Sequence, residues 1–276
     1  MAGFPSGSAI EYDNNRLYIF GDDAPYLLVL DTLYNPFDSV SFLTDTAYRI
    51  SKDTKPDIES TTLITHLDEK HLYALGSFST KERQSLYYFP LAYTDSFLKI
   101  SLHNTTELFR GLEEINIEGL AFTGTSFIMA NRANYSNRSN HLIISNELNP
   151  SAENLYSVIE LILDTSTVKG ISGLYYHLER DILFFTASEE ETNNAFEDGV
   201  IKDSYLGWIS SFSDKQDNKK VSADQLIKLS DVDRAFTSQK IESLCVQDVR
   251  RDHFTLHLVA DNDKGQSRIF KMILKL

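Results

Sequence analysis

The chain has 276 residues, of which 42% are apolar and 24% are charged, a balance that allows a globular core. Its net charge of -14, without any run of Lys and Arg, excludes nucleic acid as a partner because such a surface repels phosphate backbones. No stretch approaches the roughly 20 apolar residues that span a bilayer. We therefore expect a soluble monomer without a membrane span. We expect it in the cytoplasm, or in the periplasm if an export signal has been removed.

The first part of the chain reads as consecutive short strands. A strand is expected over 8–12, followed by a turn at 13–15 (Asp, Asn, Asn) and a second strand over 16–23. The turn residues tolerate left-handed backbone angles, which indicates a β-hairpin. Further strands are expected over 26–30 and 39–43.

This pattern of a short strand, a turn and an apolar strand recurs along the whole chain. The later units open at 58–63, 117–122, 170–176 and 240–246. A long polar insertion follows the fourth unit's second strand, roughly over 190–204, and exceeds the usual length of a hairpin loop. Helix is expected only as single turns or short segments.

Five positions align as the starts of the units, roughly 50 to 70 residues apart. They are Ser8, Glu59, Glu118, Ser172 and Glu242. Such a period, with about four strands in each unit, predicts an all-β five-bladed β-propeller that fills residues 1–276 as a single domain. A six-bladed propeller with one degenerate blade hidden in 190–240 is the alternative, and a β-sandwich fits the regular repeat less well. The last unit shows three clear strands, so the closing blade is expected to have three.

The first strand of each propeller blade lines the central channel, so residues at equal repeat positions form a ring. Glu59, Glu118 and Glu242 share one position, and serines take the other two places. Three converging carboxylates repel one another unless they share protons, pair with cations or bind a metal. Oxygen ligands of this kind suit Ca²⁺ or Mg²⁺. In the structural alternative, the glutamates cap backbone N–H groups, with Lys240 or Arg132 as counter-ion.

Polar residues also end the second strand of several units. From their place in the sequence, we expect these residues to lie toward the opposite end of the neighbouring channel strand, although loops could bring some of them to a rim of the propeller. They are Asp22, Asp23, Asn131, Arg132, Glu189, Asp261 and Asp263. Among these we take Asp22, Arg132 and Asp261 as candidate binding residues.

Other chemistries lack a signal. The histidines show no zinc spacing with nearby thiolates, and no nucleophile elbow or glycine-rich phosphate loop is present. Cys245 is the single cysteine, so no intramolecular disulfide can form. Because it lies in an apolar strand, we expect a buried, inert thiol.

The openings of the second, third and fifth units resemble a known group of proteins. The runs Ile58-Glu59-Ser60, Ile117-Glu118-Gly119-Leu120-Ala121 and Ile241-Glu242-Ser243-Leu244 resemble the strand openings of bacterial propellers related to the SdiA-regulated and esterase-like phytase families. Ser6-Gly7-Ser8-Ala9-Ile10, together with Gly21-Asp22-Asp23, resembles the start of an uncharacterised family in that neighbourhood. The resemblance implies a five- or six-bladed propeller. In the similar lactonase propellers a glutamate at the start of a channel strand binds Ca²⁺, and Glu59, Glu118 or Glu242 could match it.

Three functions follow as hypotheses. The first is a binding module for an unknown small molecule or protein, with a divalent cation in a carboxylate-lined channel. The second is a Ca²⁺-dependent hydrolase of lactones, esters or phosphoesters, in which Glu118 and Glu242 hold the metal. The third is a protein-interaction scaffold, which an apolar patch around Phe196 and Trp208 would favour. Whether the protein is an enzyme stays open.

Overall fold

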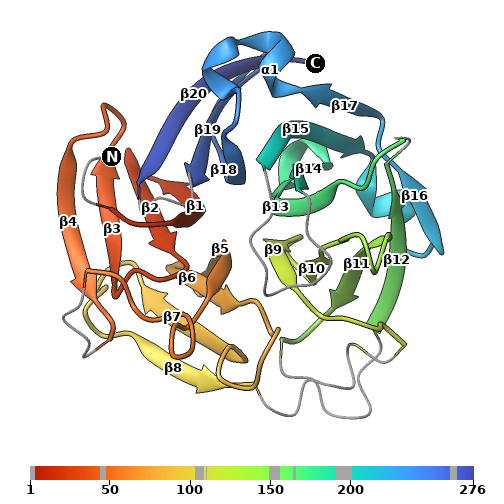
Figure 1. Cartoon of the computed structure of the whole chain (residues 1–276). Coiled ribbons are helices and arrows are strands. Elements are labelled where there is room, and N and C mark those ends of the chain that lie inside the picture. Colours follow the sequence, from red (N-terminus) through yellow and green to blue (C-terminus); the bar gives the residue numbers. More distant parts are fainter. Residues whose placement is uncertain are drawn as a thin grey trace.

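The computed structural model of the chain describes residues 4–43, 48–102, 109, 111–148, 156–163, 166–190, 201–261 and 266–276. Within them, five sheets stand around one central axis (Figure 1). The first strand of each sheet lies innermost, and the following strands lie progressively farther from the axis. The fold is an all-β five-bladed propeller, which confirms the architecture that the repeat predicts.

Each blade is built from strands that are consecutive or nearly consecutive in sequence. The first contains β1 (Gly7–Asp13), β2 (Arg16–Gly21), β3 (Tyr26–Asp31) and β4 (Pro36–Ser41). The second contains β5 (Ile58–His66), β6 (Glu69–Gly76), β7 (Ser85–Pro90) and β8 (Leu98–Ser101). The third contains β9 (Ile117–Phe122), β10 (Phe127–Asn131), β11 (Asn140–Ser145) and β12 (Tyr156–Ile162). The fourth contains β13 (Gly170–His177), β14 (Ile182–Glu190), β15 (Ile201–Ser210) and β17 (Gln225–Lys228). The closing blade contains β18 (Lys240–Arg250), β19 (His253–Asp261) and β20 (Ser267–Lys275).

The segment that could have hidden a sixth blade completes two existing ones. β16 (Lys220–Ser222) adds to the third blade as a parallel neighbour of β12, and β17 forms the outer strand of the fourth. The six-bladed alternative is therefore wrong, because the described strands of 190–240 pair with blades already present.

The helices whose bounds the structure describes are short connections. They are η2 (Leu178–Arg180), η3 (Phe212–Lys215), α1 (Leu229–Val232) and η4 (Arg234–Phe236). The ring of Phe236 lies 4.5 Å from that of Phe270 on β20, so η4 packs on the closing blade. Among the described residues, no helix has the length and apolar character needed to cross a membrane.

Local sequence explains the tight hairpins. Asn14 and Asn15, between β1 and β2, have positive φ angles of 44° and 61°. Asparagine tolerates this region better than most residues, and consecutive left-handed residues suit the right-handed twist of a hairpin. The hairpin predicted from these residues is confirmed, with Asp13 opposite Arg16 in the ladder.

The core lies between blades and is divided into five apolar clusters, one at each blade interface. Between the fourth and closing blades, Phe184 and Trp208 pack with Leu256. Between the closing and first blades, Ile10 packs with Cys245, whose thiol is buried as the sequence predicts. Because each blade covers apolar faces of its neighbours, the blades depend on closure of the ring.

Closure depends on a buried serine. The hydroxyl of Ser267, at the start of β20, donates to the carbonyl of Phe4 at 3.0 Å and accepts from the backbone N–H of Gly7 at 2.6 Å. Ser267 is 1% exposed. The closing blade has three strands, which confirms the sequence expectation, and the N-terminal residues join it through these bonds.

We predict that Ser267→Ala destabilises the ring. The substitution leaves the buried N–H of Gly7 without this acceptor, and the expected loss is about 1–3 kcal/mol in the free energy of unfolding. Urea denaturation monitored by tryptophan fluorescence measures it. Ser222→Ala, at an exposed position of β16, is the control and is expected to change stability by less than about 0.5 kcal/mol. Equal effects of the two substitutions would contradict the role of Ser267.

Candidate functional site

The five aligned repeat positions occupy one structural position. Each is the residue that is skipped in the ladder between the first and second strands of its blade, which is the sign of a β-bulge. They are Ser8, Glu59, Glu118, Ser172 and Glu242. A bulge redirects the side chain of the extra residue. The repeat therefore delivers five redirected side chains to one mouth of the channel.

The two serines serve the backbone. The hydroxyl of Ser8 donates to the carbonyl of Ile58, and that of Ser172 donates to the carbonyl of Ile241 at 2.6 Å. Each acceptor lies at the start of the next inner strand in space, so each serine ties one blade to its neighbour. Glutamate cannot do this when ionised, because a carboxylate only accepts hydrogen bonds.

Glu118 belongs to an ion-pair network with Arg132 and Glu190. The guanidinium of Arg132 lies 3.2 Å from the carboxylate of Glu118 and 2.8 Å from that of Glu190, and it also donates to Ser188 at 2.9 Å. Asn116 donates to the other oxygen of Glu118 at 2.7 Å. Burial lowers the pKa of Arg132, but the negative charges of Glu118 and Glu190 raise this pKa by more, so the guanidinium stays charged.

Glu242 joins the same network through Lys240. The ammonium of Lys240 lies 3.0 Å from Oε1 of Glu242 and 3.7 Å from Oε2 of Glu190. The second oxygen of Glu242 is buried and accepts no hydrogen bond from the described residues. Burial raises the pKa of Glu242 to about 8, Lys240 opposes this shift and Glu118 adds to it.

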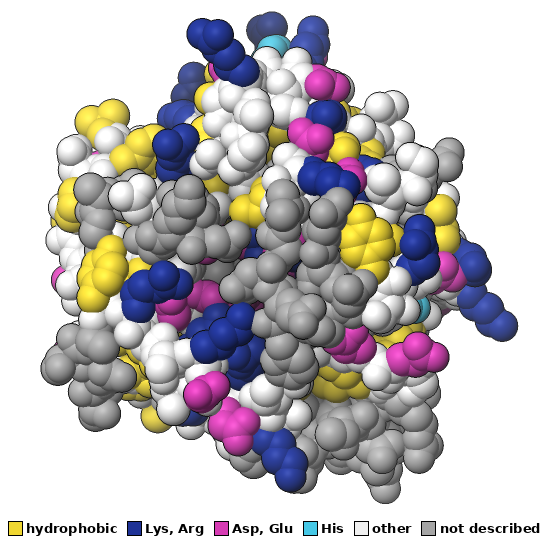
Figure 2. Space-filling model, in the orientation of Figure 1, with side chains coloured by type: hydrophobic (Ala, Val, Ile, Leu, Met, Phe, Trp, Pro, Cys, Tyr) yellow, Lys and Arg dark blue, Asp and Glu magenta, His cyan; other side chains and the backbone are white. Residues whose placement is uncertain are grey.

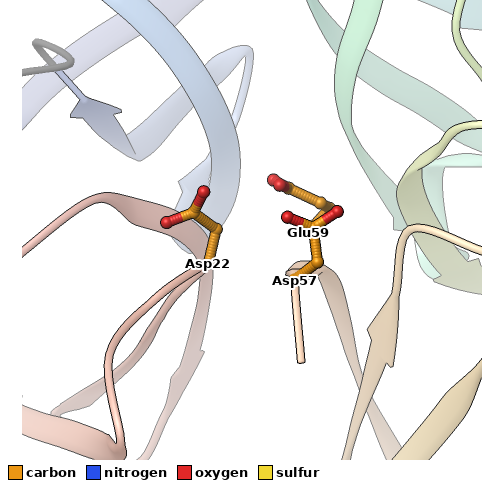
Figure 3. A group of neighbouring side chains, drawn as sticks. All are labelled: Asp22, Asp57 and Glu59. Atoms are coloured by element: carbon orange, nitrogen blue, oxygen red, sulfur yellow. The ribbon is translucent and has the colours of Figure 1, made fainter. Parts of the chain in front are cut away.

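A second cluster lies beside the first and contains Glu59. One carboxylate oxygen from each of Asp22, Asp57 and Glu59 lies within 4.8 Å of the other two (Figure 3). Asp22 follows β2 in the first blade, Asp57 directly precedes β5 in the second, and Glu59 is the second residue of β5. The cluster therefore bridges two blades.

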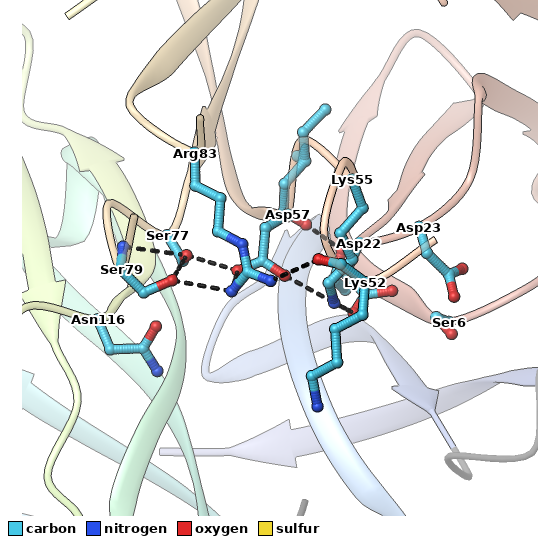
Figure 4. A network of polar contacts seen from close by, with 12 residues as sticks. Ser6, Asp22, Asp23, Lys52, Lys55, Asp57, Ser77, Ser79, Arg83 and Asn116 are labelled. Atoms are coloured by element: carbon cyan, nitrogen blue, oxygen red, sulfur yellow. Dashed lines mark hydrogen bonds and ion pairs between the residues drawn. The ribbon is translucent and has the colours of Figure 1, made fainter. Parts of the chain in front are cut away.

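Two cations already neutralise part of this cluster. The ammonium of Lys55 pairs with Asp22 and lies 2.6 Å from Asp57. The guanidinium of Arg83 lies 2.8 Å from the other oxygen of Asp57, which also accepts a hydrogen bond from Ser77 at 2.5 Å (Figure 4). Asp57 is thus fully engaged. One oxygen of Asp22 is buried without a hydrogen-bond partner in the described part of the chain.

Glu59 differs from its neighbours because its carboxylate has no hydrogen bond or ion pair with any described residue. It is half-buried at the channel. Burial raises the pKa of Glu59 well above its usual value, and the negative charges of Glu118, Asp57 and Asp22 raise it further. The carboxyl group can therefore hold a proton at a pH where isolated glutamates are ionised.

A cavity of about 250 Å³ adjoins this cluster. Asp22 and Asp261 both line it, together with Asp23, Arg49 and Lys52. Arg49 pairs with Asp23 at 2.6 Å. On this face of the molecule, basic and acidic side chains lie next to one another near the centre of the ring (Figure 2).

The structure distributes the predicted site residues over these groups. Of the three predicted metal ligands, only Glu59 lies in the carboxylate cluster, whereas Glu118 and Glu242 pair with Arg132 and Lys240. Of the three candidate binding residues, Asp22 and Asp261 share the cavity, and Arg132 binds Glu118.

The expected position of the second-strand ends is wrong. Ile117 pairs with Asn131 and Lys240 pairs with Asp261, so the second strands end at the mouth where the first strands begin. The physical reason is that neighbouring strands run antiparallel. The side-chain oxygen of Asn131 accepts a hydrogen bond from the backbone N–H of Asn116 at 2.7 Å, so this side chain has a structural role. Asp263 lies outside the described residues.

The sequence reasoning missed Lys55, Asp57 and Arg83. The repeat contains a signal for Asp57, because this residue stands two positions before Glu59. The residues two positions before the other repeat positions also lie at the mouth. The residues at this offset are Ser6, Asp57, Asn116, Gly170 and Lys240. No repeat marks Lys55 and Arg83, which lie in connections outside the inner strands.

An exposed apolar patch around Phe196 and Trp208 would require Trp208 to be exposed. Trp208 lies on β15 and is 9% exposed in the core between two blades. Phe196 lies outside the described residues. Trp208 therefore cannot contribute to an exposed apolar patch that would favour a scaffold.

We predict that Arg132→Met lowers the free energy of unfolding by about 3–5 kcal/mol, because it leaves buried carboxylates without their main cation. Chemical denaturation measures the loss. Arg138→Met is the matched control, since Arg138 is exposed and its substitution is expected to have little effect. A small loss for Arg132→Met would contradict the network.

The raised pKa of Glu59 predicts a pH dependence of stability. The folded state holds this proton above the usual pKa of 4.5, so stability falls as pH rises above about 4.5. Glu59→Gln removes the titration. The stability of the variant relative to the wild type is expected to increase as the pH rises above about 4.5, by at most about 1.4 kcal/mol for each step of one in pH. Urea denaturation at several pH values measures this difference, and Glu147→Gln, at an exposed position, is the control variant.

Comparison with solved structures supports the fold alone. The chain is similar to an alpha-L-arabinanase mutant from Cellvibrio cellulosa, with 13% identity and a TM-score of 0.52 over 100% of this chain and 92% of that chain. A DUF4221 family member from Bacteroides vulgatus has 8% identity and a TM-score of 0.42 over 96% and 76% of the two chains. A streptogramin B lyase has 7% identity and a TM-score of 0.40 over 98% and 84%.

Sequence comparison identifies the family. Among curated proteins, no sequence matches the chain. The relation to the SdiA-regulated and esterase-like phytase propellers stays a prediction. The profile of a family described as "Family of unknown function (DUF6929)" matches residues 3–274. Since this match spans nearly the whole chain, the protein belongs to the DUF6929 family.

Proposed function

We propose that the protein is a binding module whose channel mouth takes up a divalent cation between Asp22, Asp57 and Glu59. The observation that carries this proposal is the carboxyl of Glu59, which has no partner among the described residues and lies within 4.8 Å of two further carboxylates. Carboxylate oxygens are hard ligands of the kind that Ca²⁺ and Mg²⁺ prefer. The adjoining cavity gives room for water or for a small ligand that completes the coordination.

Lys55 is an internal competitor for this cation. Its ammonium lies between Asp22 and Asp57, where it supplies the positive charge that the carboxylates need. A metal ion entering the cluster has to displace this ammonium from at least one carboxylate. The affinity is therefore expected to be modest, and it should increase when the lysine charge is removed.

Glu118 and Glu242 would contribute charge rather than coordination. Each is paired with a cation of its own, and neither belongs to the cluster of three carboxylates. Their negative charge still acts on the mouth, since Glu118 raises the pKa of Glu59. The same field favours entry of a cation into the channel.

A hydrolase is the second candidate. Glu59 combines a raised pKa with partial exposure and lies beside other carboxylates, which is the environment of a general acid. With a metal ion at the cluster, this group could protonate the leaving group of a lactone, ester or phosphoester while the metal polarises the reacting bond. The binding module stays the leading proposal, because it needs only the carboxylates and the cavity.

Calcium is expected to raise the melting temperature of the wild-type protein. Binding to the folded state alone stabilises it by mass action, about 2.7 kcal/mol at a concentration one hundred times the dissociation constant. Differential scanning fluorimetry with CaCl₂ and MgCl₂ titrations measures the shift. Glu59→Gln should abolish it, and Lys55→Met should strengthen metal binding by roughly tenfold, as expected for about 1.4 kcal/mol of lost competition.

The control for this titration is Glu147→Gln, which should respond to calcium like the wild type. A shift that persists unchanged in Glu59→Gln would place the cation elsewhere. If neither ion shifts the melting temperature, the metal proposal fails. Turnover of ester or phosphoester substrates by the wild type, lost in Glu59→Gln, would favour the hydrolase.

A further inference from the structure

The other mouth of the channel contains a larger cavity of about 630 Å³. Its lining comes from the C-terminal parts of the inner strands β5, β13 and β18, from the end of β9 and from the connection after β13. On β18, Val246 lines this cavity, whereas Glu242 belongs to the acidic mouth. The two positions are four residues apart along the strand, which corresponds to roughly 13 Å. The two cavities are therefore distinct sites.

The lining of this second cavity is aromatic and acidic. Phe122, Tyr175, Tyr176 and His177 contribute rings, and burial lowers the pKa of His177, which keeps its imidazole neutral. The ionisable acids are Glu179 and Asp248, and no Lys or Arg occurs among the described lining residues. Asp248 pairs with Arg250 at 2.6 Å at an exposed position. The described lining of this cavity therefore combines aromatic rings with carboxylates and contains no lysine or arginine.

A buried carboxyl group lies next to this cavity. Glu11 on β1 is 4% exposed and lies behind the lining, where its carboxyl accepts a hydrogen bond from the backbone N–H of Leu63 and lies near Tyr175, two residues that line the cavity. One oxygen accepts from the N–H of Tyr12 at 3.3 Å. No described Lys, Arg or His forms an ion pair with it. Burial raises its pKa to about 8.

The lack of a counter-ion among the described residues distinguishes Glu11 from the paired acids of the opposite mouth. There, Asp57, Glu118 and Glu242 each have a Lys or Arg within 3.2 Å. A buried, unpaired carboxylate is unfavourable, so an acid in this position stays protonated until a cation arrives. Glu11 combines this property with an aromatic cavity large enough for a small organic molecule.

We propose that this cavity binds a small organic ammonium ion, whose charged group pairs with Glu11 and whose hydrocarbon part lies against Phe122 and Tyr175. Aromatic faces attract ammonium groups, and the effect grows when water is excluded. The acidic lining disfavours anions. A metal ion would find only one buried carboxyl among the described residues here, fewer oxygen ligands than Ca²⁺ or Mg²⁺ needs.

Binding would be linked to proton release. An ammonium ligand favours ionised Glu11, so the proton that this group holds in the free protein is lost on binding. Below pH 8, the affinity should therefore rise by up to tenfold per pH unit. The titratable groups that act on Glu11 or lie beside it are Asp13, Tyr175 and Cys245. Burial raises the pKa of Tyr175 and of Cys245, so both remain neutral in this range.

The test uses isothermal titration calorimetry of the full chain with n-hexylammonium chloride, and with 1-hexanol as an uncharged analogue. We expect hexylammonium to bind at least tenfold more tightly than hexanol at pH 7. Titration in two buffers of different ionisation enthalpy should show proton release, and affinity should be higher at pH 7 than at pH 6. These measurements need no variant.

Glu11→Gln retains the shape of the side chain and should weaken hexylammonium binding at least tenfold, without changing hexanol binding. Glu59→Gln alters the acidic mouth and should bind hexylammonium like the wild type, which separates this site from the proposed metal site. Equal affinity for amine and alcohol, binding without proton release, or undiminished binding by Glu11→Gln would each overturn the proposal. So would the absence of binding by the wild type.

Discussion

Charge neutralisation around a narrow axis is the constraint on which the arrangement of this propeller's mouth depends. Five inner strands begin at one mouth, and a bulge at the start of each redirects one side chain. Like charges brought together in this way have to be protonated or paired with cations. Where the repeat position is Ser8 or Ser172, the side chain instead bridges to the next blade and adds no charge.

The mouth meets this constraint with two separate clusters. Lys55 and Arg83 neutralise part of the charge of Asp22, Asp57 and Glu59. Arg132 and Lys240 do the same for Glu118, Glu190 and Glu242. Each cluster thus contains one more carboxylate than cations among the described residues. In one cluster the excess acid is Glu59, at the channel, and in the other Glu242 is buried with a raised pKa. This difference in access is why the proposed cation site involves Glu59.

At the opposite mouth, the negative charge is neutralised in a different way. A single buried acid, Glu11, meets an aromatic cavity and has no cation partner among the described residues. A protonated carboxyl is the stable form until a positively charged group enters. The two mouths therefore differ in what a ligand has to do: at the first it must displace resident cations, and at the second it would supply the missing positive charge. Both depend on the same inner strands, held by the five interblade cores and by Ser267 at the closure.

The fold and the ring of equivalent positions could be predicted from the amino-acid sequence alone. Strand and turn signals are local, so their period indicates five blades, a three-stranded closing blade and the equivalence of Glu59, Glu118 and Glu242. The partners of these charges depend on the folded arrangement, because Arg132 bridges two blades and Lys55 and Arg83 come from connections that no repeat marks. Antiparallel pairing also places Asp22 and Asp261 at the mouth where the inner strands begin. Glu11 follows the ordinary alternation of a strand, and it is the packing of the surrounding blades that buries it without a described cation.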